Sequence, residues 1–125
     1  RILEEEHIID RVRTETAPYL AQKWKALGDH PLVGETAIAG MMGSFAMTPH
    51  KESRAKFAAE PGSIGYMCRE HCFANNLVMR HVYDRMIISP PLVISTDEID
   101  QLIARATNAL DATYAQAKSE GLLNV

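Results

Sequence analysis

The stretch LVMRHVYDRMIISPP restricts the fold more than any other part of the chain. Apolar and polar residues alternate along it, which is typical of a half-buried strand. The pattern predicts a strand over residues 77–82, a tight turn at 83–85 and a second strand over 86–89. The two prolines that follow cannot continue a central strand. The fold should therefore contain a β-hairpin that ends at this proline pair.

A helical pattern occupies residues 2–27, where apolar side chains recur on one stripe with charged residues between them. Pro18 interrupts this pattern. Thr16 would cap a new helix start there, or the helix would kink at the proline. The sequence GDHP at 28–31 is a helix stop, with glycine at the end and proline shortly after.

Two further helices are expected. The first covers residues 64–75. The second begins with a capping box, in which Ser95 and Glu98 are three residues apart, and it continues as an amphipathic pattern to about Gly121.

Between the first two helices, the apolar and glycine-rich run at 32–47 predicts two short strands, at 33–39 and 41–47. Gly40 and Gly43 are candidates for a bend, a bulge or a close backbone approach. A polar connection with a short helical turn is expected at 48–63. The order of elements is then helix, two strands, helix, two strands, helix. This order predicts an α+β fold, with a small antiparallel sheet of about four strands and helices on one face.

The composition agrees with one globular domain over residues 1–125, with 46% hydrophobic and 23% charged residues. A net charge of -3 argues against a nucleic-acid partner, because such partners usually select a basic face. No apolar run is long enough to span a bilayer. Two cysteines are too few for a disulfide framework, so a cytoplasmic setting is expected. The chain opens without Met and already with helical composition, so we expect it to be one domain of a longer protein.

Arg80 is the unusual residue of the hairpin. Side chains alternate along a strand, so Val78, Arg80 and Val82 share one face. A buried guanidinium needs a partner, because an unpaired buried charge is costly. One interpretation is a clamp that binds a carboxylate through two parallel hydrogen bonds. The others are an ion pair with a local acid such as Asp84, or an edge residue whose charge reaches solvent. Periodicity alone favours the structural interpretations.

The other candidate groups favour structural roles. Cys68, His71 and Cys72 recur at helical spacing, but a closed zinc site wants four ligands and no histidine pair supplies the rest. His30 and Asp84 are expected to be turn residues. The lysines, at positions 23, 25, 51, 56 and 118, lie in polar settings, and none has the buried surroundings that favour a Schiff-base amine.

Four segments of the chain match a known pattern: HPLVGE at 30–35, CREHCFANNLVMR at 68–80, DRMIISPPLVIS at 84–95 and EIDQLIARATNALDAT at 98–113. Together they resemble the class III pyridoxal-phosphate aminotransferases of the omega type. The resemblance implies the small C-terminal domain of an enzyme similar to the amine:pyruvate and putrescine:pyruvate transaminases. Residues 1–125 would pack against a large domain of the same chain, which holds most of the pyridoxal phosphate site. The enzyme would be a homodimer or a dimer of dimers.

The resemblance also implies roles for two residues. Arg80 matches the family's mobile arginine, which binds the carboxylate of an amino or keto acid and swings away for an amine. Val82 matches a neighbouring pocket-lining position. The Schiff-base lysine would lie in the large domain, so this part of the chain is not expected to be active alone.

The chain departs from the family pattern at four places. Ala37, Ile38 and Ala46 stand where arginine, glycine and glutamate are usual, and Tyr83 replaces the usual glycine of the hairpin turn. These departures bear on which substrate the protein uses and on whether it has full activity. Two alternatives remain open at this point. One is a non-enzymatic α+β module that binds a carboxylate, and the other is a class III relative with mutase or decarboxylase activity.

Overall fold

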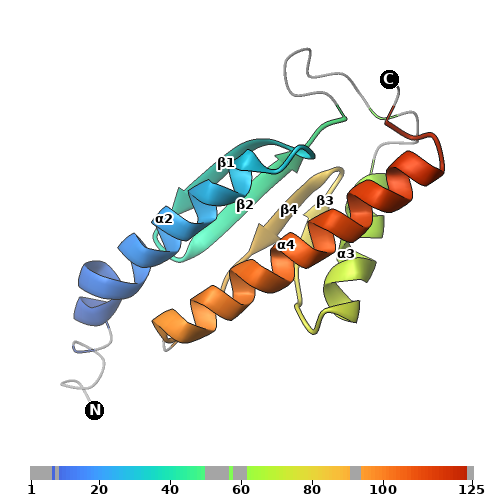
Figure 1. The fold of residues 1–125 in the computed structure, drawn as a ribbon. Coiled ribbons are helices and arrows are strands. Elements are labelled where there is room, and N and C mark those ends of the chain that lie inside the picture. Colours follow the sequence, from blue (N-terminus) through green and yellow to red (C-terminus); the bar gives the residue numbers. More distant parts are fainter. Residues whose placement is uncertain (1–6, 8, 50–56, 58–61, 91–93, 124–125) are drawn as a thin grey trace.

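The computed structural model describes residues 7, 9–49, 57, 62–90 and 94–123. Its centre is a four-stranded antiparallel sheet with the strand order β1-β2-β4-β3. The strands are β1 (Val33–Ala39), β2 (Met42–Met47), β3 (Arg80–Val82) and β4 (Arg85–Ile88). The main helices are α2 (Ala17–Ala26), α3 (Ser63–Ala74) and α4 (Thr96–Ser119). The element order and the α+β fold expected from the sequence are confirmed (Figure 1).

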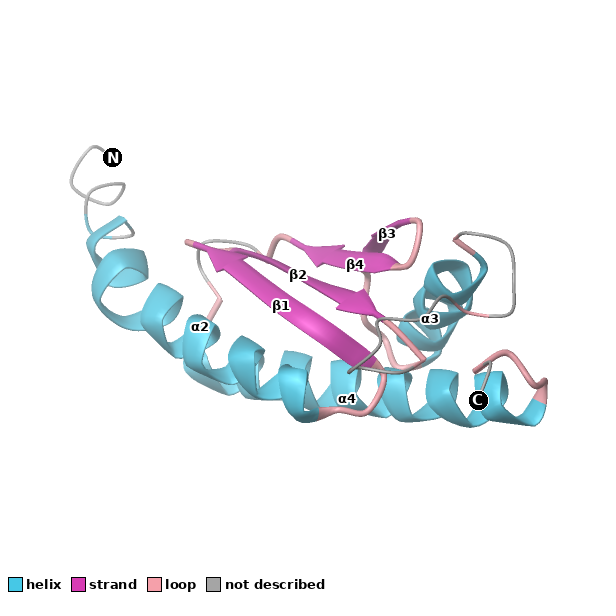
Figure 2. Ribbon diagram, turned by 90° about the horizontal axis from the view of Figure 1, so that it is seen from above, coloured by secondary structure: helices cyan, strands magenta, loops and turns pink. Residues whose placement is uncertain are grey.

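The helices leave one side of the sheet uncovered. Figure 2 shows α2 and α4 running along the same side of the strands. Strand side chains on that side such as Phe45, Met47 and Met86 are buried. They form the core together with residues such as Trp24 and Leu110 from the two helices. Any group on the opposite side of the sheet is therefore free of helix contacts within the described residues.

The first helix passes through Pro18 without a new cap. A π-helical turn covers Val12–Thr16, and the proline falls in the first turn of α2. The Thr16 hydroxyl donates to the carbonyl oxygen of Arg11 at 3.3 Å and makes no capping bond. Of the two alternatives at the proline, the cap is wrong. The wider turn accommodates a residue that has no N–H to donate.

The two glycines of the first hairpin are required for different structural reasons. Gly40 has a φ of +58° in the two-residue loop between β1 and β2. A Cβ atom at Gly43 would lie 2.8 Å from Cε2 of Trp24, so a side chain there would displace the indole. The Trp24 Nε1 donates to the carbonyl oxygen of Ser44 at 2.9 Å, which fixes α2 across β2. Gly40 is thus the bend and Gly43 the close approach.

The strand predicted over 77–82 is shorter in the structure, where β3 begins at Arg80. Helix α3 ends in a Schellman motif, in which the amides of Asn76 and Leu77 donate to the carbonyls of Phe73 and Cys72. Asn76 takes the left-handed conformation that this motif requires, with a φ of 59°. The residues just before β3 form this chain reversal and do not pair as a strand. The observed strand is therefore shorter than the predicted one.

The second hairpin and the last helix agree closely with the sequence. The loop is Tyr83 and Asp84, since Arg85 already pairs with Val82 at the start of β4. The capping box of α4 is present, with Glu98 N donating to Ser95 Oγ at 3.1 Å. The helix ends before Gly121, which has a φ of +72°. The predicted connection at 48–63 lies mostly outside the described residues. Among the helices that are described, none is long and apolar enough to cross a membrane.

Candidate functional site

Arg80 lies on the edge strand β3, and its side chain is exposed. Val78 and Val82 are also exposed, at 72% and 49%, whereas Met79 between them is buried. The alternation therefore places Arg80 and Val82 on the same face, as the sequence predicts. This face is the one that the helices leave uncovered.

Strand register shows which residues share that face. Arg80 pairs with Ile87, Ile87 with Ser44, and Ser44 with Ala37. A second row runs from Val82 through Arg85, Ala46 and Glu35. We call this side of the sheet the outer face, defined by these two rows: Arg80, Ile87, Ser44 and Ala37, and Val82, Arg85, Ala46 and Glu35.

A second arginine lies on the outer face and was missed by sequence reasoning. Arg85 forms an ion pair with Glu35 of β1, and its Nη1 donates to Ser44 Oγ of β2 at 2.9 Å. The sequence prediction put Arg85 in the turn, where a side chain has no fixed face. The strand register would have revealed this arginine, because it places Glu35, Ser44 and Arg85 on the same side of three adjacent strands.

Arg80 has no such partner among the described residues. The Asp84 carboxylate, the local acid considered from the sequence, accepts the backbone N–H of Gly65 at 3.0 Å. No ion pair joins Asp84 to Arg80 in the part of the chain that the structure describes. An exposed guanidinium on an edge strand can reach solvent or bind an added carboxylate.

A shallow hollow of about 250 Å³ lies on the outer face over β1, β2 and β4. Its lining is mostly small and apolar, with Ala37, Ala39, Ser44 and Ile87, and Arg85 supplies the charge. The hollow suits a small apolar group, because its lining is mainly apolar and the Arg85 guanidinium at its border is already paired with Glu35.

Two departures from the family pattern also lie on the outer face. Ala37 is exposed and Ala46 is half-buried, whereas Ile38 points to the core side. Ala46 lies between Glu35 and Arg85 in one row of the sheet, and these two side chains form an ion pair across it. A glutamate at position 46 would be next to Arg85 and would compete with Glu35 for it.

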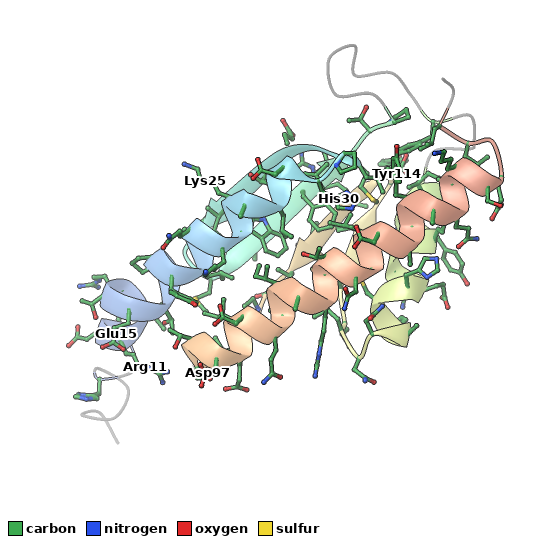
Figure 3. The ribbon with its side chains drawn as sticks, viewed as in Figure 1. Arg11, Glu15, Lys25, His30, Asp97 and Tyr114 are labelled. Atoms are coloured by element: carbon green, nitrogen blue, oxygen red, sulfur yellow. The ribbon has the colours of Figure 1, made fainter. Side chains whose placement is uncertain are left out.

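His30 has the structural role expected of a turn histidine. Its Nδ1 accepts the backbone N–H of Leu32 at 3.1 Å, so Nε2 carries the proton and donates to Asp111 Oδ1 at 2.8 Å. Figure 3 shows His30 beside Tyr114, and their rings meet edge to face with centroids 6.3 Å apart. These contacts attach the turn before β1 to α4.

Cys68 and Cys72 are buried and carry no disulfide. His71 lies between them in sequence, but its Nε2 is 2.6 Å from Gln116 Oε1 on α4. The described residues contain no group of three His, Cys, Asp or Glu side chains that could hold a metal ion. The zinc interpretation set aside from the sequence gains no support from these positions.

Comparison with known proteins identifies relatives over nearly the whole chain. A putrescine–pyruvate aminotransferase of Pseudomonas aeruginosa is 51% identical over 115 residues, which are 92% of this chain and 25% of the relative. A gamma-aminobutyrate transaminase of Solanum lycopersicum is 31% identical over 113 residues, 90% of this chain and 21% of the relative. No family model matches the chain.

A solved structure with a similar fold is also a transaminase. A thermostable omega transaminase from Pseudomonas jessenii superimposes with a TM-score of 0.83 at 25% identity, over 93% of this chain and 25% of that one. The homologues of this chain are aminotransferases. The resemblance seen in the sequence is confirmed, and the chain spans about a quarter of the length of the relatives it matches.

The described residues do not fit pyridoxal phosphate by themselves. That cofactor needs a lysine, an acidic partner for its ring nitrogen and a phosphate cradle. Of the described lysines, Lys25 and Lys118 are exposed, and Lys23 lies over the ring of Tyr19. On the outer face, Arg85 is already paired with Glu35. The described residues therefore do not supply this set of groups.

Proposed function

We propose that residues 1–125 form the small C-terminal domain of a longer pyridoxal-phosphate aminotransferase. The observation that carries this proposal is the 51% identity to a putrescine–pyruvate aminotransferase, over a quarter of its length. The remaining three quarters would include a large domain of the same chain. When bound there, pyridoxal phosphate supplies the electron sink for amino transfer. The alternative of a non-enzymatic binding module is not favoured, because the homologues described above are aminotransferases.

The reaction would move an amino group from an amine or an omega-amino acid to a keto acid such as pyruvate. Putrescine and pyruvate are the pair named for the bacterial relative, so a short diamine and pyruvate are the first substrates to test. The assembly would be a homodimer or a dimer of dimers in the cytoplasm. Light scattering on the full-length protein tests the assembly.

Arg80 would select substrates that carry a carboxylate. Its side chain is exposed on the outer face, and no described residue holds it in an ion pair. The planar guanidinium can bind both oxygens of a carboxylate at once. It would bind the keto acid in one half-reaction and turn toward solvent when the amine occupies the same pocket. Val82, two residues along the same face, would line that pocket.

The test is Arg80→Ala in the full-length enzyme, with the two half-reactions measured separately. A hydrogen-bonded charge is worth about 1.5–3 kcal/mol, so kcat/KM for pyruvate should fall about 10- to 100-fold. The half-reaction with putrescine should change little, because a diamine has no carboxylate. Arg80→Lys should restore only part of the loss, since an ammonium cannot bind both oxygens in a fork.

The matched control is Arg69→Ala, which removes an arginine from α3, where it lies over the ring of Phe73. This variant should leave both half-reactions unchanged. Equal losses in both half-reactions of Arg80→Ala, or no loss in either, would show that Arg80 does not act as a carboxylate clamp. Amino-acceptor profiling of the wild-type protein separates a transaminase from a mutase or decarboxylase relative.

A further inference from the structure

Three sulfur atoms meet in the core between α3, α4 and the segment before β3. Cys68 and Cys72 are four residues apart on α3, so they lie on the same side of that helix. The Sγ of Cys72 is 3.7 Å from the Sδ of Met79. All three side chains are at most 2% exposed. This sulfur cluster of Cys68, Cys72 and Met79 has no part in the proposed transaminase site.

The helix end explains why Met79 returns to α3. Asn76 in the left-handed conformation closes the Schellman motif, and the amide of Leu77 donates to the carbonyl oxygen of Cys72 at 2.8 Å. The chain therefore reverses beside Cys72. Met79, seven residues after Cys72, then points into the core at the same level. The backbone reversal therefore brings Met79 back beside Cys72.

The two thiols differ in acidity. The neighbouring Cys72 side chain lowers the pKa of Cys68, and burial opposes this shift. The neighbouring Cys68 side chain and burial both raise the pKa of Cys72.

The helical spacing of Cys68 and Cys72 does not favour a disulfide between them. Residues four apart on a helix have Cβ atoms about 5–6 Å apart. A disulfide needs about 3.5–4.5 Å between Cβ atoms, so it would require α3 to unwind. A metal ion removes this restriction, because two metal–sulfur bonds of about 2.3 Å join sulfurs that are up to about 4.6 Å apart.

We propose that Cys68, Cys72 and Met79 form a buried site for a soft monovalent metal ion, Cu(I). Thiolate and thioether sulfur select this ion, and three donors are enough for it, whereas structural zinc wants four. Cu⁺ replaces the proton of one of the two thiols, and H⁺ is released. The ion and one thiolate make a neutral unit, which the apolar surroundings tolerate far better than a net charge. The other cysteine and Met79 complete the shell as neutral donors.

The test is anaerobic titration of the full-length protein with Cu(I) against a chromophoric Cu(I) chelator. Cys68→Ala and Cys72→Ala should each lose one bound equivalent relative to the wild type. Met79→Leu should keep that equivalent with an affinity at least about tenfold lower, because it loses one donor of similar shape. Met86→Leu is the matched control, since it replaces another fully buried methionine, and its affinity should stay unchanged.

Equal binding by the wild type and both cysteine variants would overturn the proposal, as would equal affinities of Met79→Leu and Met86→Leu. If the cysteine variants do not fold, X-ray absorption on wild-type protein with one equivalent of Cu(I) decides the matter. A shell of sulfur alone supports the site, and a shell with nitrogen or oxygen overturns it.

Discussion

The two hairpins of the sheet reach the same turn conformation with different residues. Each has a two-residue loop, and the first loop residue has a positive φ, at 58° for Gly40 and 53° for Tyr83. Glycine takes this conformation at no steric cost, whereas tyrosine is strained in it. No other atom lies near the Cβ position of Gly40. The second loop, in contrast, is attached to the rest of the molecule.

Helix α3 and strand β2 hold the second loop in place. The Asp84 carboxylate accepts the backbone N–H of Gly65 at 3.0 Å, in the first turn of α3. The Asp84 carbonyl oxygen accepts the N–H of Met47 at 2.9 Å. The comparison teaches that tertiary contacts can fix a turn that its own residues disfavour. Because the loop next to Arg80 is held, the movement proposed for Arg80 should be confined to its side chain.

Gly65→Ala should break the attachment of the second hairpin and have the largest effect. The new Cβ would overlap the carbonyl oxygen of Tyr83, which is backbone and cannot turn away. We expect a loss of about 3 kcal/mol, measured as a lower midpoint of thermal unfolding of the full-length protein. Gly40→Ala is the matched control in the free hairpin, and it should cost only about 1 kcal/mol, from its positive φ. Similar losses in both variants would contradict the difference between the hairpins.

Asp84→Ala should weaken the attachment without introducing a clash. The variant removes the acceptor of the Gly65 N–H and a negative charge at the start of α3. A cap of this kind is worth about 1–2 kcal/mol. Hydrogen exchange should show faster exchange at the Gly65 amide and the neighbouring amides of α3. Asp84→Asn keeps an acceptor, so it should lose less than half as much. Unchanged exchange in Asp84→Ala would mean that the carboxylate does not hold the helix.

The sequence predicted well those features that depend on neighbouring residues. The capping box at Ser95 and the glycine stop at Gly121 are local, and both were predicted at their correct positions. Arg85 was misplaced because its partners Glu35 and Ser44 lie on other strands, 50 and 41 residues away in the chain respectively. Their alignment depends on the register of β1, β2 and β4, which a single sequence does not contain. The meeting of Met79 with Cys72 was missed for a similar reason, since it depends on the left-handed Asn76.

Tyr83→Gly should make the second hairpin more like the first and have the smallest effect. It removes about 1–2 kcal/mol of strain at the positive φ, but glycine costs about 0.5–1 kcal/mol more in lost chain entropy. We expect a net stabilisation of about 0.5 kcal/mol, seen as a small rise in the unfolding midpoint. The contacts of Asp84 stay, so the loop should remain attached and kcat/KM for pyruvate should not change. A lower kcat/KM for pyruvate with an unchanged putrescine half-reaction would show that the loop backbone takes part in the movement of Arg80. The motion could then no longer be assigned to the arginine side chain alone.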